Sequence, residues 1–144
     1  MMNNQVVEVL EYDGIGYKPL VDYGQWRVAF LRYIDELRPD AIRFMERHVE
    51  TDEVFVLLEG QAVLFLGGNE ATITEMTPLV MKPGRLYNVK RNAWHTVVLS
   101  GDATILLVEN RNTGRENTEY CDLNPQQRAF LLETAQRQQP EWWL

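Results

Sequence analysis

The sequence contains few residues of the types that usually carry chemistry: one cysteine, Cys121, and two histidines, His48 and His95, in 144 residues. A single cysteine cannot form a disulfide within the chain, so hydrophobic burial and hydrogen bonds must hold the fold. We expect the Cys121 thiol to behave as a small buried side chain, because no histidine is close to it in sequence. Histidine chemistry is confined to two short stretches.

Long apolar runs and an excess of positive charge are also missing. No window reaches the roughly 18 apolar residues that a membrane-spanning helix requires, and the N-terminal stretch lacks the cationic and apolar parts of an export signal. The formal net charge is -7 and the isoelectric point is near 4.8. Nucleic acids and anionic membranes bind basic surfaces. The sequence therefore predicts a cytoplasmic protein with a small-molecule substrate, and neither nucleic acid nor membrane as partner.

The length and the spacing of turns indicate one β-rich domain over residues 1–144. A hydrophobic content of 45% with 24% charged residues is typical of a soluble domain with its own core. Short apolar runs separated by turns at 8 to 12 residue spacing predict an antiparallel sandwich or barrel, with its core at about 26–110. We expect strands at residues 6–10, 26–34, 42–48, 54–58, 62–66, 71–74, 86–89, 96–99 and 104–108. Residues 26–34 also fit a helix running to Leu37, but their β-branched and aromatic content favours the strand.

The end of the chain has a helical pattern instead. Asn124 supplies an N-cap and Pro125 a favoured first helical residue, which predicts a helix at about 125–138. Pro140 ends the pattern. The apolar tip formed by Trp142, Trp143 and Leu144 is expected to pack on the domain or on a subunit partner.

His48, Glu53 and His95 are the candidate catalytic residues. His48 and Glu53 flank a polar bend, so they face one interior if the strands on either side are neighbours, and His95 begins a separate apolar run. Two imidazoles and one carboxylate bind Fe, Mn, Ni or Zn with coordination positions left open. Without a metal ion the same groups serve as general acid and base. The simpler alternative is that each histidine is only hydrogen-bonded at a strand end.

The spacing around these residues resembles that of the cupin superfamily. His48, four residues, Glu53, six residues and Gly60 are similar to the latter part of the first cupin motif, with Glu46 where the motif has another histidine. Pro83-Gly84 followed by His95 resembles the second motif. The resemblance implies a cupin double-stranded β-helix, a jelly-roll barrel of the all-β class, here with a C-terminal α-helix. It also implies His48, Glu53 and His95 as metal ligands, with Glu46 as an additional one.

A closer resemblance is to the ureidoglycolate lyase family. It is carried over roughly residues 42–132 by the Glu46-Arg47-His48 and Arg91-Asn92-x-Trp94-His95 elements. It implies cleavage of ureidoglycolate into glyoxylate and urea in purine breakdown, and a homodimer. The substrate-binding residues that this resemblance and the local positive charge indicate are Arg91, Lys90, Trp94 and Asn88.

Three functions remain open at the level of sequence. The first is a ureidoglycolate-lyase-like enzyme, with no metal firmly implied, in which His48 or His95 is the base. The second is a divalent-metal isomerase or oxygenase that uses His48, Glu53 and His95. The third is a barrel that binds a sugar or other metabolite without turnover. Glu53 stands where the lyase family typically has glutamine, so this carboxylate separates the first two alternatives.

Overall fold

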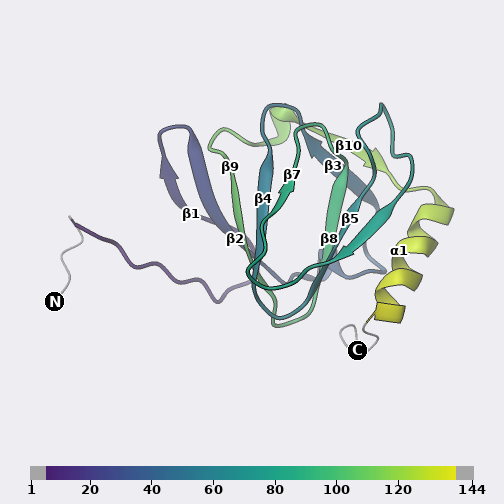
Figure 1. Cartoon of the computed structure of the whole chain (residues 1–144), viewed down its shortest axis with the longest axis horizontal. Coiled ribbons are helices and arrows are strands. Elements are labelled where there is room, and N and C mark those ends of the chain that lie inside the picture. Colours follow the sequence, from purple (N-terminus) through teal and green to yellow (C-terminus); the bar gives the residue numbers. More distant parts are fainter. Residues whose placement is uncertain (1–5, 139–144) are drawn as a thin grey trace.

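The computed structural model describes residues 6–138, which form two antiparallel sheets and one C-terminal helix (Figure 1). The strand order is β1-β2-β9-β4-β7 in the first sheet and β10-β3-β8-β5-β6 in the second. The strands are β1 Gly16–Tyr23, β2 Trp26–Arg32, β3 Phe44–His48, β4 Glu53–Glu59, β5 Ala62–Leu66, β6 Thr77–Val80, β7 Tyr87–Val89, β8 His95–Leu99, β9 Thr104–Asn110 and β10 Thr118–Asp122. Short 3₁₀ turns occupy Asp35–Leu37 and Arg115–Asn117, and the helix is α1 Pro125–Gln138.

Two strands of the second sheet, β5 and β8, are buried on both faces, which explains their apolar sequences. In β5 the side chains alternate between an inner core, which lies between the two sheets, and an outer core, which lies between the second sheet and α1. Leu64 packs between the two sheets with Phe55 and Ile105, whereas Phe65 packs outward beneath α1 with Leu131. A strand covered on both sides carries a continuous apolar run rather than an alternating one.

Helix α1 is held at its start by reciprocal hydrogen bonds. The backbone N–H of Gln127 donates to Oδ1 of Asn124 at 2.8 Å, and the backbone N–H of Asn124 donates to Oε1 of Gln127 at 2.9 Å. This arrangement satisfies donors that a helix end otherwise leaves unpaired. The predicted N-cap and helix are therefore confirmed.

The predicted all-β class with a C-terminal helix is confirmed, and several strand predictions are wrong. Residues 6–10 and 71–74 form no strand, and β1 and β10 extend the sheets beyond the range 26–110. The β-branched residues at 71–74 reflect burial of Ile73 in the outer core rather than strand pairing. β10 was missed because its sequence is polar and its pairing with β3 depends on tertiary contact.

Other expectations concern the chain's surface and its end. Cys121 is half-buried and packs at the edge of the outer core. Within residues 6–138, no helix has the length and hydropathy that a membrane span requires. The predicted packing of Trp142, Trp143 and Leu144 lies outside the described residues.

Gly60 makes the turn from β4 to β5, and its close approach to a neighbouring loop leads to a stability prediction. Its φ is 72°, and a Cβ there would lie 2.5 Å from Cα of Ala103. We expect Gly60→Ala to lower the free energy of unfolding by more than about 2 kcal/mol, because left-handed strain and a backbone clash add together. Urea denaturation measures the loss.

Gly24→Ala is the matched control. Gly24 also has a positive φ, 56°, but nothing lies within 4 Å of the added Cβ. In this variant only the backbone strain should lower the free energy of unfolding, by about 1 kcal/mol. Equal losses in the two variants would contradict the role assigned to the contact with Ala103.

Candidate active site

The two sheets enclose a cavity of about 620 Å³. One wall comes from β3 and β10, because alternate side chains of adjacent strands share a face. On β3 these are Phe44, Glu46 and His48, and on β10 they are Thr118 and Tyr120, which pair with His48 and Glu46. Apolar side chains make up much of the remaining lining: Leu31, Leu37, Ile42, Phe55, Val97 and Leu107.

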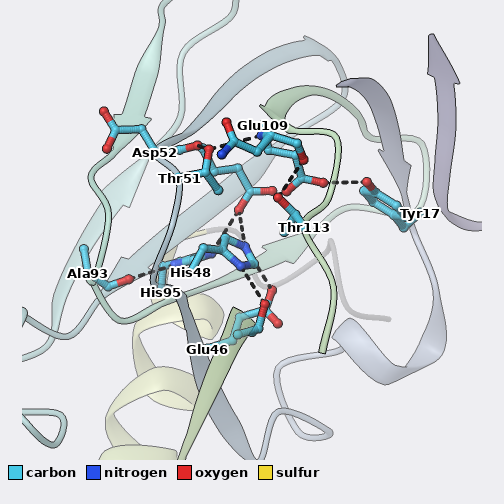
Figure 2. Close-up of polar contacts among 12 residues, drawn as sticks. Tyr17, Glu46, His48, Thr51, Asp52, Ala93, His95, Glu109 and Thr113 are labelled. Atoms are coloured by element: carbon cyan, nitrogen blue, oxygen red, sulfur yellow. Dashed lines mark hydrogen bonds and ion pairs between the residues drawn. The ribbon is translucent and has the colours of Figure 1, made fainter. Parts of the chain in front are cut away.

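Four side chains that line this cavity contact one another, and we call Glu46, His48, Glu53 and His95 the four-donor site. Figure 2 labels Glu46, His48 and His95 of this site. His48 ends β3, Glu53 begins β4 and His95 begins β8. Nε2 of His48 lies 3.0 Å from Oε1 of Glu53, and Nε2 of His95 lies 3.2 Å from the same oxygen. Oε1 of Glu46 lies 3.9 Å from Nε2 of His48. The structure thus brings together every sequence-predicted catalytic residue and the additional ligand Glu46.

The outer nitrogens of the two imidazoles are held by fixed oxygen atoms. Nδ1 of His95 lies 3.0 Å from the carbonyl oxygen of Ala93, and Nδ1 of His48 lies 2.9 Å from Oγ1 of Thr118. A carbonyl only accepts, so Nδ1 of His95 carries the hydrogen. In the neutral ring, Nε2 then directs a lone pair at Glu53. Because the pKa of Glu53 is lowered and its carboxylate is ionised, this contact requires a positive charge, either a proton on the ring or a metal ion between the two groups.

Burial and charge act against each other in the four-donor site. Burial alone would lower the pKa of both imidazoles, but hydrogen bonding and the negative charge of Glu53 outweigh it and raise the pKa of His48 and of His95. Burial favours the protonated form of Glu53, yet the two histidines lower its pKa overall. Burial raises the pKa of Glu46. The site therefore stabilises positive charge beside an ionised Glu53.

A third buried carboxyl group, Glu109, lies on the opposite wall beside this site. It is the last residue but one of β9, is 6% exposed, and accepts a hydrogen bond of 2.5 Å from the hydroxyl of Tyr17 on β1 (Figure 2). Oxygen and nitrogen atoms of His48, Glu53 and Glu109 all lie within 4.8 Å of one another. Burial and the charge of Glu53 raise the pKa of Glu109 to about 7.

The raised pKa of Glu109 predicts how stability depends on pH in protein freed of metal by a chelator. The folded pKa lies above the value of 4.5 for an unperturbed glutamate, so the folded state binds the proton more tightly. The resulting stabilisation is complete below pH 4.5 and is lost as pH rises through about 7. The free energy of unfolding of Glu109→Gln is expected to equal that of the parent near pH 4.5. Above about pH 7 it should exceed that of the parent by about 1 to 3 kcal/mol.

Urea denaturation of both proteins across this pH range measures the difference. Glu59→Gln, an exposed position on β4, is the control and should follow the parent throughout. A constant difference between Glu109→Gln and the parent at every pH would contradict the raised pKa.

The residues predicted to bind substrate do not line this cavity, and their role stays a prediction. Asp52 engages three of them outside: its carboxylate accepts from Nζ of Lys90 at 2.7 Å, from Nδ2 of Asn88 at 3.1 Å and from the backbone N–H of Arg91 at 2.8 Å. Trp94 is 2% exposed and packs in the outer core. These residues build the turn that leads into His95.

Several cavity residues escaped sequence analysis, and some left a detectable signal. Glu109 follows Ile105 and Leu107 at alternate positions, so a glutamate on an apolar strand face marks it. Tyr17 and Thr118 left no comparable signal, because their strands were not predicted. Arg115 lines the cavity from the turn before β10. Only tertiary structure brings that turn to the site.

Comparisons with known proteins give structural neighbours alone, since no protein-family profile and no curated sequence matches. A PAC13 variant from Streptomyces, with uridine, aligns at a TM-score of 0.52 and 15% identity over 78% of this chain and 83% of that one. CapF from Staphylococcus aureus, a capsular polysaccharide assembling protein, aligns at 0.55 and 12% identity over 85% of this chain. The aligned region is only 34% of CapF.

A third neighbour is a cupin-2 domain containing protein from Shewanella frigidimarina, with a TM-score of 0.49 and 16% identity over 69% of this chain and 85% of that one. Identities this low bear on the fold alone. The two five-stranded antiparallel sheets, with a helix on the outside of one of them, agree in fold with the two neighbours whose TM-scores exceed 0.5, PAC13 and CapF. This chain therefore has the all-β cupin fold, with a C-terminal helix.

Proposed function

We propose that this chain is a cupin enzyme that holds one divalent metal ion at the four-donor site and acts on a small polar molecule in the cavity. The convergence of Glu46, His48, Glu53 and His95 supports the proposal. Neighbouring ligand atoms on an ion with bonds of about 2.1 Å lie about 3 Å apart when they meet at right angles. The separations of 3.0 and 3.2 Å from Oε1 of Glu53 fit this arrangement.

The chemistry of the donors fits a first-row divalent ion. Imidazole nitrogens and carboxylate oxygens together suit Fe, Mn, Ni or Zn. The hydrogen on Nδ1 of His95 leaves Nε2 free to bind an ion, and the carbonyl of Ala93 fixes that orientation. The hydroxyl of Thr118 holds Nδ1 of His48 at 2.9 Å, and it can accept a hydrogen from this nitrogen and so leave Nε2 free as well. When bound, the ion would polarise a substrate oxygen and lower the pKa of a hydroxyl group.

The remaining cavity residues supply binding and proton transfer. Glu109 holds a proton near neutral pH and faces the site from the opposite wall, where it can donate to a substrate oxygen. Tyr17 keeps this carboxyl group in place. The apolar lining favours the burial of apolar parts of a substrate.

Metal analysis tests the proposal directly. Protein stripped by a chelator and titrated with Mn²⁺ or Zn²⁺ should bind one ion per chain, as measured by calorimetry and elemental analysis. His95→Ala should abolish binding, while Glu59→Gln, outside the cavity, should bind as the parent does. Folded parent protein that binds neither ion would refute the proposal.

A metal-free carbon–nitrogen lyase acting on ureidoglycolate is the second candidate. The raised pKa of both histidines favours it, because a proton can supply the positive charge that Glu53 requires. One imidazole would take the hydroxyl proton as the C–N bond breaks and a carbonyl forms, and the second, protonated, would give its proton to the leaving urea nitrogen. The nucleoside dehydratase Pac13, at a TM-score of 0.51, supports elimination chemistry in a barrel of this fold.

An assay for urea separates the two candidates. The lyase candidate predicts urea release from ureidoglycolate by chelator-treated protein, with loss of activity in His48→Ala. Release that needs added metal would favour the first candidate. Binding without any product would leave the cavity as a metabolite-binding site, and thermal stabilisation by the ligand would detect it.

A further inference from the structure

The β3–β10 wall presents three kinds of chemistry in a fixed order along its length. An aromatic pair, Phe44 and Tyr120, occupies one part of the cavity wall. His48 of the four-donor site comes next: Tyr120 pairs with Glu46, which lies two residues from His48 on β3, or about 7 Å along an extended strand. Arg115 follows at the other end, in the 3₁₀ turn that leads directly into β10. A ligand lying along this wall meets the three in sequence.

Arg115 is the cation available at this end of the cavity. Among residues 6–138 the cavity lining contains two arginines, Arg43 and Arg115. Nη1 of Arg43 already donates to the carbonyl oxygen of Asp40 at 2.8 Å. Within the described chain, Arg115 forms no ion pair or side-chain hydrogen bond. A guanidinium group at the edge of a cavity, without a protein partner, is suited to bind an anionic group of a ligand.

The turn that carries Arg115 is built by a buried side chain. Asn117 is 9% exposed, and its Oδ1 accepts from the backbone N–H of Gly114 at 2.9 Å. Its Nδ2 donates to the carbonyl oxygen of Asn112 at 3.0 Å. These hydrogen bonds close the turn on both sides of Arg115 and fix where its backbone meets the cavity.

Phe44 and Tyr120 form an aromatic surface that lacks a covering side chain. Their ring centroids lie 5.4 Å apart in an edge-to-face arrangement, and the residues are 46% and 49% exposed. Both line the cavity, and Tyr120 is paired across the strands with Glu46 of the four-donor site. Aromatic rings left open in a cavity favour a planar ring as ligand.

We propose that the cavity takes an anionic small molecule with a planar ring at one end, which packs on Phe44 and Tyr120, and an anionic group at the other, which Arg115 binds. A hydroxylated linker between them would lie at the four-donor site. A nucleoside monophosphate has these three parts in this order. The inference rests on the proposed function only in taking the four-donor site as the place of reaction.

The charges in the cavity make Arg115 the discriminating residue. Glu36, Glu46 and Glu53 also line the cavity, and their negative charges would repel an anion. Arg115 offsets this repulsion only for a ligand whose anionic group reaches the end of the wall. A neutral ligand gains nothing from Arg115, and an anion without a ring gains nothing from Phe44 and Tyr120.

Calorimetry with the full chain tests the inference with three probes: uridine monophosphate, uridine and ribose phosphate. Uridine monophosphate is expected to bind about tenfold or more tightly than either of the other two. Arg115→Gln should reduce its affinity to that of uridine without changing uridine binding. Tyr120→Ala should reduce the affinity for uridine monophosphate to that for ribose phosphate. Arg128→Gln, an exposed position on α1 outside the cavity, is the matched control and should bind all probes as the parent does.

Equal affinities for the three probes would overturn the inference, and so would an Arg115→Gln variant that binds uridine monophosphate as the parent does. The metal content of each sample keeps this outcome separate from the proposed function. Stoichiometric metal without a preference among the probes refutes only the ligand class. A preference without bound metal refutes only the metal site.

Discussion

Glu53→Gln is expected to lose metal binding while the protein remains folded. Glu53 is 5% exposed, and a single oxygen, Oε1, lies near both imidazoles of the site. An amide of the same shape removes the negative charge that lies between His48 and His95. Loss of an outer partner of a metal ligand typically weakens binding by about 10- to 100-fold, and loss of a ligand itself should exceed that. Calorimetric titration with Mn²⁺ measures the change.

Glu59 lies on the same strand, and Glu59→Gln is the control for replacing a carboxylate by an amide outside the site. Glu59 is exposed and outside the cavity, so its variant should bind metal as the parent does. Circular dichroism should show both variants folded. If Glu53→Gln retained parental affinity, Glu53 would not be a ligand, and the metal proposal would rest on the remaining three donors.

Phe65→Ala is expected to cause the largest loss of stability. Phe65 is fully buried on β5, in the core between the second sheet and α1. Removing a buried phenyl ring loses its transfer free energy and leaves a cavity, at a cost of about 3 to 5 kcal/mol. Urea denaturation should show an earlier midpoint with an unchanged slope.

Phe130→Ala provides the comparison for the same substitution on the surface. Phe130 lies on α1 and is 38% exposed, so its replacement should cost about 1 kcal/mol or less. Similar losses in the two variants would mean that the outer core does not hold α1 to the sheet.

The strands that could be predicted from the sequence are those with mostly buried, apolar side chains. The apolar run that forms β5 was predicted with its observed bounds, Ala62–Leu66, because it is buried on both faces. β10 has two exposed charged residues, Glu119 and Asp122, and one face that lines a cavity instead of a core. Nothing in its local pattern distinguishes it from a loop. Its hydrogen bonds to β3 decide its structure.

The candidate site was predictable where one bend connects two strands. His48 and Glu53 lie on either side of residues 49–52, so their meeting follows from a tight connection between β3 and β4. The cations near His95 were predicted to bind substrate, and the structure shows that one of them, Lys90, pairs with Asp52 at 2.7 Å. Local positive charge could not reveal this partner. The predicted homodimer and cytoplasmic location remain predictions.

The two faces of β3 limit how this protein could change during evolution. Glu46 and His48 point into the cavity, while Met45 packs in the outer core and the guanidinium of Arg47 lies 4.3 Å from the ring centre of Trp94. Insertion or deletion of one residue within β3 would exchange these faces, removing the donors and burying charge beneath α1 at the same time. New substrates are therefore expected to arise by substitution at Phe44, or by changes in the length of the turn that carries Arg115, rather than by insertions in this strand.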